Sequence, residues 1–128
     1  GRAGETGRPA AMNAKENKMS QTSALQVTDA NFTTEIEESK GLAMVDFWAA
    51  WCGPCRMVGP VVEQLAAEYA DQGVKVAKLD VDSNPRTTAR FGIRSIPAIL
   101  FFKDGKQVDT VVGAVPKAHL EQKIQHHL

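Results

Sequence analysis

The chain has 128 residues, 15 basic and 15 acidic side chains and two cysteines, and its length suits a single domain. Because the net charge is zero and no apolar run approaches the ~20 residues that cross a bilayer, we expect neither a nucleic-acid partner nor a membrane partner. Two cysteines supply neither the disulfide framework of a small secreted protein nor a four-cysteine zinc site.

The N-terminal stretch, residues 1–24, has the composition of a disordered tail. It contains no Leu, Ile, Val, Phe, Trp or Tyr, so it buries too little apolar surface to offset the entropy of ordering it. It also lacks the apolar stretch of a secretory signal. We interpret it as a vector remnant plus a natural start, with a transit-peptide remnant as the alternative, and we expect the folded domain over residues 25–128.

In chain order, the domain begins with a short strand, a helix and a buried strand. Residues 25–28 are extended, and capping residues around Asp29 start a helix that runs to about Ser39. The run Leu42–Trp48 is apolar except for Asp46. Such runs are typical of strands buried on both faces of a mainly parallel sheet.

A long helix and a second buried strand follow. The segment Trp51-Cys52-Gly53-Pro54-Cys55 leads into a helical pattern that extends to about Asp71, with Pro60 inside it. A proline there is expected to kink the helix, because it lacks the N–H group and its ring clashes with the preceding turn. Gly73 ends this pattern, and Val74–Val81 is the next predicted strand.

The second half of the domain predicts a helix, a hairpin and a closing helix. A short helix starts at Pro85, and strands over Pro97–Lys103 and Gln107–Val112 are joined by Asp104-Gly105, a strong hairpin signal. Pro116 opens the last helix. The order βαβαβαββα predicts an α/β fold, with a mixed sheet of about five strands flanked by four helices.

The two cysteines are predicted to play different roles. Cys55 shares a helical stripe with Val58, Val62 and Leu65, so we expect it to be buried. Cys52 lies at the helix N-terminus, where free N–H groups and the helix dipole favour a thiolate. Cys52 is therefore predicted to be the exposed nucleophile that attacks a disulfide, and Cys55 the thiol that resolves the mixed disulfide.

Asp46 is predicted to assist this chemistry. A carboxylate in an otherwise apolar strand is costly to ionise, so we expect a raised pKa or a charged partner. Lys78, in the middle of the next buried strand, is the expected partner. A carboxyl with a raised pKa near a thiol is suited to proton transfer with Cys55; the alternative is that Asp46 only pairs with Lys78.

The segment Val45-Asp46-Phe47-Trp48-Ala49-Ala50-Trp51-Cys52-Gly53-Pro54-Cys55 resembles the active-site signature of the thioredoxin family, and the likeness extends from about Leu25 to Leu128. Further matching segments are Pro60, Lys78–Asp82, Ile93–Pro97, Lys103–Gly105 and Val112–Ala114. The resemblance implies the thioredoxin fold. Ser95 and the segment Gly113–Lys117 look like the cyanobacterial and plastid m-type branch, whereas Ala50, Arg56 and Gly59 depart from the best-known pattern.

The resemblance also implies a substrate site. Pro97 is expected to follow a cis peptide bond opposite the cysteines, and the backbone of Ile96 to bind an extended substrate chain. The Gly53-Pro54 dipeptide is similar to that of the reducing members. The residues expected to line the substrate groove are Trp51, Val81, Ile96, Val112, Gly113 and Ala114.

The function implied by the resemblance is that of a general protein-disulfide reductase without a bound cofactor. Its electrons are expected from a thioredoxin reductase that uses flavin with NADPH, or from ferredoxin if the source is a plastid or a cyanobacterium. Expected targets are ribonucleotide reductase, peroxiredoxin and methionine sulfoxide reductase. We expect a monomer in the cytoplasm, with the plastid stroma as the alternative.

Three other functions share parts of this pattern. A C-x-x-C pair is half of a zinc knuckle, but the other ligands would be His119, His126 and His127, which lack the H-x₃₋₅-H spacing. No metal site is therefore expected. A scaffold built on the same fold and an oxidase or isomerase are the remaining alternatives.

Overall fold

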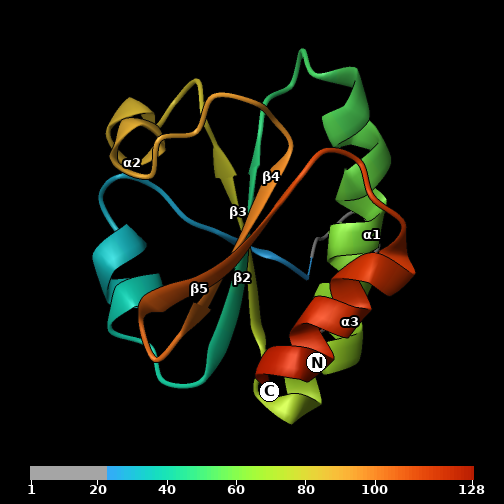
Figure 1. Ribbon diagram of the computed structural model, residues 1–128. Helices are drawn as coiled ribbons and strands as arrows, with labels where there is room; N and C mark the ends of the chain where they lie inside the picture. Colours follow the sequence, from blue (N-terminus) through green and yellow to red (C-terminus); the bar gives the residue numbers. More distant parts are fainter. Residues whose placement is uncertain (1–22) are drawn as a thin grey trace, which may run out of the picture.

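The computed structural model describes residues 23–128, which form one mixed β-sheet covered by helices on both faces (Figure 1). The strands of this part of the chain are β1 (Leu25–Gln26), β2 (Leu42–Trp48), β3 (Lys75–Asp80), β4 (Ala98–Lys103) and β5 (Lys106–Val112). Its helices are η1 (Thr33–Glu37), α1 (Gly53–Tyr69), η2 (Ala70–Gln72), α2 (Pro85–Arg90) and α3 (Lys117–His127). The predicted α/β class and mixed sheet are confirmed.

The strand order in the sheet is β1-β3-β2-β4-β5. β3 runs parallel to β1 and to β2, whereas β4 is antiparallel to both β2 and β5. β2 therefore lies in the centre of the sheet, with hydrogen-bonded neighbours on both sides. This position explains its apolar sequence, since the residues of a central strand face packed helices on both sides.

The two faces of the sheet carry separate parts of the core. α1 and α3 cover one face, and η1 and α2 cover the other (Figure 1). On β2, Met44 packs with Val62 of α1 and Leu120 of α3, whereas its neighbours Ala43 and Val45 pack on the opposite face. Because side chains alternate along a strand, Asp46 lies on the same face as Met44, beneath α1.

The hairpin between β4 and β5 has the predicted turn. Both turn residues have positive φ, 50° at Asp104 and 85° at Gly105, the conformation that matches the twist of a two-residue hairpin. A Cβ atom at Gly105 would lie 2.0 Å from the backbone oxygen of Glu37. Glycine is therefore required here both by the turn and by the close approach of η1.

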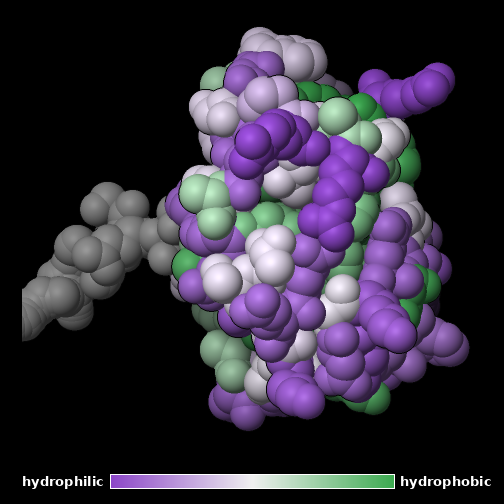
Figure 2. Space-filling model, turned by 90° about the vertical axis from the view of Figure 1, so that its left-hand side faces the viewer, coloured by the Kyte–Doolittle hydropathy of each residue, from purple (hydrophilic) through white to green (hydrophobic). Residues whose placement is uncertain are grey.

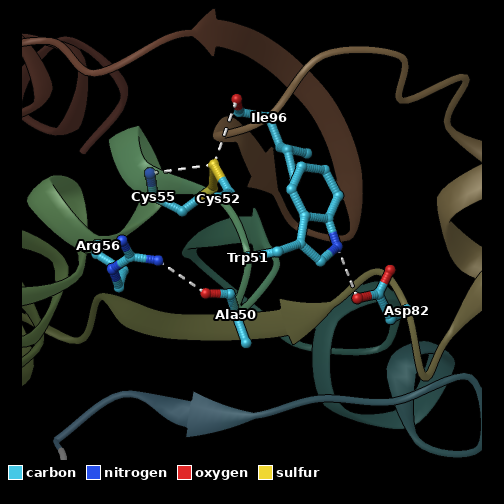
Figure 3. Close-up of a disulfide and its surroundings, with 7 residues drawn as sticks. All are labelled: Ala50, Trp51, Cys52, Cys55, Arg56, Asp82 and Ile96. Atoms are coloured by element: carbon cyan, nitrogen blue, oxygen red, sulfur yellow. Dashed lines mark hydrogen bonds between the residues drawn. A yellow bond between two sulfur atoms is a disulfide. The ribbon is translucent and has the colours of Figure 1, made fainter.

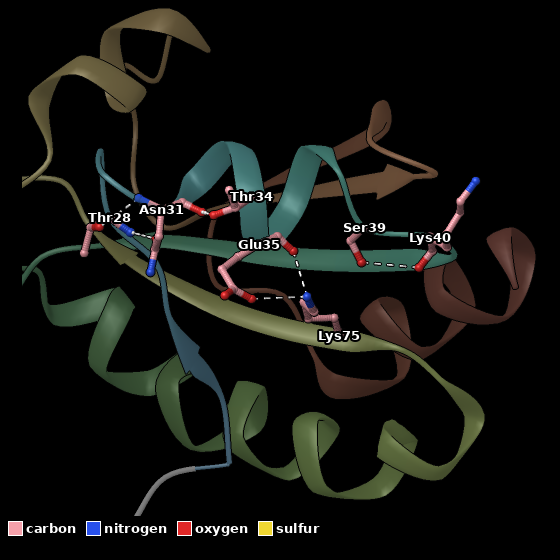
Figure 4. Close-up of polar contacts among 7 residues, drawn as sticks. All are labelled: Thr28, Asn31, Thr34, Glu35, Ser39, Lys40 and Lys75. Carbon is pink, nitrogen blue, oxygen red and sulfur yellow. Dashed lines mark hydrogen bonds and ion pairs between the residues drawn. The ribbon is translucent and has the colours of Figure 1, made fainter.

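The predicted helix up to about Ser39 is wrong in length and in type, because the structure has a five-residue π-helical segment, η1, over Thr33–Glu37. The turn before it is closed by reciprocal hydrogen bonds, since Thr28 N donates to Asn31 Oδ1 (2.7 Å) and Asn31 N donates to Thr28 Oγ1 (3.3 Å) (Figure 4). The N-cap of η1 itself, Phe32, has no side-chain capping hydrogen bond within the described chain. Capping residues mark where a helix begins, but the length of so short a helix depends on tertiary contacts.

One such contact joins η1 to the sheet. Lys75 of β3 donates to the backbone oxygen of Glu35 at 2.8 Å and lies 3.3 Å from its carboxylate (Figure 4). Both Phe32 and Ile36 are buried against the sheet. Figure 2 shows the side of the molecule that carries η1 and α2; it is mostly hydrophilic, with apolar side chains visible between the polar ones.

The folded part begins earlier than residue 25. Ala24 is 5% exposed and belongs to the core beneath α1, and Ser23 and Ala24 both donate backbone N–H groups to Glu63. Ser23 and Ala24, which precede the boundary predicted from composition, therefore belong to the described fold. The rest of the predicted tail, residues 1–22, lies outside the described residues.

Within residues 23–128, no helix is long and apolar enough to cross a membrane.

Candidate active site

A disulfide between Cys52 and Cys55 closes the first turn of α1 (Figure 3). Cys52 is the N-cap of this helix, with extended backbone angles, and its Sγ accepts a hydrogen bond from Cys55 N at 3.2 Å. Gly53 and Pro54 form the first two helical positions, where the missing N–H of proline has no cost. The sulfur of Cys52 therefore lies where N–H groups and the helix dipole favour negative charge.

Both cysteines are buried, with 5% of Cys52 and 3% of Cys55 exposed. The prediction of an exposed Cys52 is therefore wrong for this disulfide state, whereas the prediction of a buried Cys55 is confirmed. Helix phase alone does not show what covers a helix end. Here the loop before β4 covers it, since the Ile96 backbone oxygen lies 3.8 Å from Cys52 Sγ (Figure 3).

The covering loop has the geometry that the resemblance implied. The Ile96–Pro97 peptide is cis, and Ile96 and Val81 both pack against the two cysteines. Pro97 O accepts a hydrogen bond from Gly113 N at 2.8 Å, and Gly113 has a φ of 100°, which favours glycine. The structure thus brings the predicted cis-proline Pro97 and the predicted groove residues Ile96 and Gly113 together beside the disulfide.

The surface around the disulfide is apolar and exposed. Trp51 is 67% exposed and Val112 is 57% exposed, and Ala114 is also exposed. Large exposed apolar side chains in one area indicate a docking surface for another chain. The predicted exposure of Trp51 is confirmed.

Two polar contacts hold this surface in place, and sequence analysis did not foresee them. Trp51 Nε1 donates to Asp82 Oδ2 at 2.9 Å, and Arg56 Nη1 donates to the backbone oxygen of Ala50 at 2.9 Å (Figure 3). Asp82 is the last residue of the matching segment Lys78–Asp82 and lies just after β3. Its carboxylate is visible in the sequence as a possible hydrogen-bond acceptor, but only the arrangement of the strands shows that it lies near Trp51.

The side chain of Asp46 is completely buried, as predicted, on the face of the sheet beneath α1. Neither carboxyl oxygen has a hydrogen-bond partner among the described residues. Burial raises the pKa of the Asp46 carboxyl from 3.8 to about 7; the Lys78 ammonium opposes this shift, and the Glu63 carboxylate adds to it. A carboxyl with this pKa exchanges protons readily near neutral pH.

Lys78 lies opposite Asp46 in the register of β2 and β3, but its ion pair is with another residue. Lys78 Nζ is 3.4 Å from Glu63 Oε2 of α1 and 5.0 Å from the centre of the Trp48 ring. The predicted partnership of Lys78 with Asp46 is therefore corrected, because Lys78 acts on Asp46 through charge without a direct ion pair. Glu63 is not identifiable from the sequence, where its only signal is a charged residue next to buried Val62.

Among the described residues, no group of three or more histidine, cysteine or acidic side chains is placed to hold a metal ion. In the disulfide state, both cysteine sulfurs are bonded to each other. A zinc knuckle would need both of them as thiolates.

A disulfide at a helix N-terminus beside an exposed apolar surface, with a buried carboxyl on the sheet face beneath the same helix, defines a thiol–disulfide exchange protein. The family model for thioredoxin matches residues 23–126. The protein named Thioredoxin 1 of Synechococcus elongatus is 56% identical over 105 residues, which cover 82% of this chain and 97% of that protein. Thioredoxin 1 of a Nostoc species is 50% identical over 107 residues (84% and 99%), and the thioredoxin of Porphyra purpurea is 51% identical over 106 residues (83% and 98%).

The chain belongs to the thioredoxin family. It is a protein-disulfide reductase that works through the dithiol and disulfide states of Cys52 and Cys55. Proteins of this family carry no cofactor, and they exchange electrons with a reductase and with target disulfides. The cyanobacterial relatives support the branch predicted from the sequence.

Proposed function

We propose that this protein is a general reductant of protein disulfides in which Cys52 attacks and Cys55 resolves. The observation that carries this assignment of roles is the position of Cys52 as N-cap of α1, at the edge of the exposed apolar surface. Cys55 lies one turn further along the helix, in the stripe that packs on the sheet. The target sulfur therefore meets Cys52 first.

In the dithiol state, the Cys52 thiolate attacks one sulfur of a target disulfide, and the other target sulfur leaves and takes up a proton. Cys55 then loses its proton, and its thiolate attacks Cys52 Sγ. The bond between Cys52 and the target breaks, and the second target sulfur leaves as a thiolate that takes up a proton from water. Two electrons have then passed to the target, both of its sulfurs have taken up protons from water, and the Cys52–Cys55 disulfide remains.

Removing the proton from the Cys55 thiol is unfavourable, because Cys55 is buried among apolar groups that do not stabilise a thiolate. We assign its transfer to Asp46, whose pKa of about 7 allows the carboxylate to accept this proton and the acid to return it. The proton returns when a reductase regenerates the dithiol. Lys78 modulates this exchange through its positive charge.

The target chain is expected to dock on the apolar surface beside the disulfide. The backbone of Ile96 is available to hydrogen-bond an extended target segment, in the manner of an added strand. Trp51, Val112 and Ala114 then contact target side chains, while Gly113 leaves room for the target backbone. This mode depends on main-chain contacts, so it suits many targets rather than one sequence.

For the electron donor, we propose a thioredoxin reductase that uses flavin with NADPH, with a ferredoxin-linked reductase as the alternative. We keep the ferredoxin-linked reductase as the alternative because the relatives from Synechococcus and Nostoc are cyanobacterial, one of the sources for which it is expected. The proposed targets are oxidised ribonucleotide reductase, peroxiredoxin and methionine sulfoxide reductase. We propose a monomer in the cytoplasm, or in the stroma if the source is a plastid.

The roles of the two cysteines are tested by substitution. Cys55→Ser is expected to accumulate covalent mixed disulfides through Cys52, because the resolving thiol is absent. Cys52→Ser is expected to lose insulin-disulfide reduction and to trap no target. The measurement is mass spectrometry of the adducts together with insulin turnover, with and without a chelator. Equal trapping by both variants would reverse the assignment, and activity that depends on added zinc would favour the metal-binding alternative.

A further inference from the structure

Glu63 lies on α1 with its side chain 23% exposed, and it binds groups from two other parts of the fold. Its Oε1 accepts hydrogen bonds from Ser23 N (2.7 Å) and Ala24 N (2.9 Å). Its Oε2 is buried and lies 3.4 Å from Lys78 Nζ of β3. Glu63 therefore joins the first described residues to the lysine beside Asp46.

In this arrangement the Lys78 ammonium group lies near two carboxyl groups, those of Glu63 and Asp46. Lys78 lies in register with Asp46 and is attracted by both acidic side chains. Glu63 receives the ammonium group at ion-pair distance and two backbone N–H donors. Asp46 receives no hydrogen bond among the described residues. Donors of this kind stabilise a carboxylate, and within the described part of the chain Asp46 lacks them, so burial favours the protonated form of Asp46.

The surroundings of Asp46 contain few other charges. From β4, the residue in register with Asp46 is Ile99, which is apolar. From β3 the facing charged group is Lys78, and from α1 it is Glu63. The cysteines of α1 are joined in the disulfide, which carries no charge. The balance between Lys78 and Glu63 therefore decides how much positive charge acts on Asp46.

We propose that Glu63 is a positioning residue for disulfide reduction, which acts through Lys78 on the proton-transfer carboxyl Asp46. This inference depends on the proposed role of Asp46. By holding Lys78 in an ion pair, Glu63 keeps the ammonium group from bonding to Asp46 directly. By its own negative charge, Glu63 also disfavours a second carboxylate nearby. Both effects keep Asp46 able to accept and release a proton near neutral pH.

The test is a pH titration of the Asp46 carboxyl carbon by NMR in the oxidised protein, where the cysteines do not titrate. Glu63→Gln removes the charge but keeps an oxygen that can accept from Ser23 and Ala24. We expect the Asp46 titration to move to lower pH by about one unit, as for a carboxyl that gains a cationic neighbour. The acid limb of the pH profile of insulin reduction is expected to move in the same direction.

Glu68→Gln is the matched control. Glu68 is on the same helix and also pairs with a lysine, Lys117, at 2.8 Å, but it is not among the charges that act on Asp46. This variant is expected to leave the Asp46 titration unchanged. A Glu63→Gln titration that coincides with that of Glu68→Gln would overturn the proposal.

Two further variants separate the possible failures. If Glu63→Gln does not fold, Glu63→Asp, which draws the charge back from Lys78, is expected to give a smaller shift of the same sign; no shift would overturn the proposal. Asp46→Asn tests the role of Asp46 itself, since its pH profile should lose the limb that Asp46 contributes. If that limb persists, the proposed role of Asp46 fails, whatever Glu63 does. If the limb is lost but Glu63→Gln has no effect, only the inference about Glu63 fails.

Discussion

At the scale of single residues, the burial that suits Asp46 to proton transfer also lowers the stability of the folded protein. Below about pH 4 the carboxyl of Asp46 is protonated in both the folded and the unfolded chain, so this group makes no pH-dependent contribution to the free energy of unfolding. Between about pH 4 and about pH 7 the unfolded chain ionises this group and the folded protein does not, so the free energy of unfolding falls as pH rises. Above about pH 7 the raised pKa of Asp46 has lowered the free energy of unfolding by an amount on the order of 4 kcal/mol.

Asp46→Asn is therefore expected to stabilise the protein in a pH-dependent way. The free energy of unfolding should rise by a few kcal/mol at about pH 8 and by much less at about pH 5, because the penalty grows between about pH 4 and about pH 7 and is only partly developed at about pH 5. Urea unfolding at both pH values measures this difference. Equal changes at the two pH values would contradict it.

Asp109→Asn is a control of opposite sign. A hydrogen bond with His127 and contact with Lys123 lower the pKa of Asp109 to about 2. A carboxyl with a lowered pKa stabilises the fold above about pH 4, and this contribution is lost as pH falls through about 2. This variant is therefore expected to lose stability at about pH 8, where Asp46→Asn gains it.

Much of the site could be predicted at this scale, because local chemistry reveals it. The cysteine spacing, the carboxyl in an apolar strand and the exposed Trp51 are all visible in the sequence. Glu63 and the true partner of Lys78 could not be predicted in this way. Which of several charged side chains meet depends on how α1 lies on β3, and that is decided by packing over the whole helix.

At the scale of elements, the β4–β5 turn and η1 depend on each other. Asp104 N donates to Gly41 O at 2.9 Å, and Gly41 N donates to Asp104 Oδ1 at 2.7 Å. Gly105 lies directly against the backbone of Glu37. The turn thus closes on the segment between η1 and β2 and leaves no space for a side chain.

Gly105→Ala is expected to lower the free energy of unfolding by about 3 kcal/mol, because the added Cβ meets rigid backbone and φ is positive. Gly73→Ala is the matched control: its φ is 79°, but no atom lies within 4 Å of the added Cβ. This control is expected to cost about 1 kcal/mol. Urea unfolding compares the two, and equal losses would show that the contact with η1 is unimportant.

Elements with a strong periodic signal were predicted well, and η1 was not. The central strand Leu42–Trp48 has the bounds that its apolar run predicted, because burial on both faces leaves a clear pattern. The short helix η1 has only Phe32 and Ile36 facing the core, so its sequence contains little periodicity. Its form is set by the sheet and by the turn it meets.

At the scale of the whole molecule, the N-terminal end of the described chain is part of the fold. Ser23 and Ala24 donate to Glu63, and Ala24 is buried in the core beneath α1. Composition could not predict this, because serine and alanine carry no signal of burial. Their place follows from β1, which adds to the edge of the sheet beside β3 and carries the preceding residues toward α1.

A truncation series tests this boundary. A chain that begins at Gln21 keeps both N–H donors and is expected to retain the melting temperature and activity of the full chain. A chain that begins at Leu25 loses both hydrogen bonds to Glu63 and is expected to be less stable by about 2 kcal/mol. Thermal unfolding measures the difference. Equal melting temperatures for the two truncated chains would place the boundary after Ala24.

The central position of β2 also has a consequence for the order in which the protein folds. The β4–β5 hairpin is local, and hairpins of this kind close in roughly 1–10 μs. β2 pairs with β3 and β4, which follow it in the chain only after long connections, so its two ladders close slowly. The Cys52–Cys55 disulfide closes a local turn of α1, whereas the burial of Asp46 needs the ladders of β2. Rapid disulfide exchange is therefore expected only once β2 has been placed in the sheet.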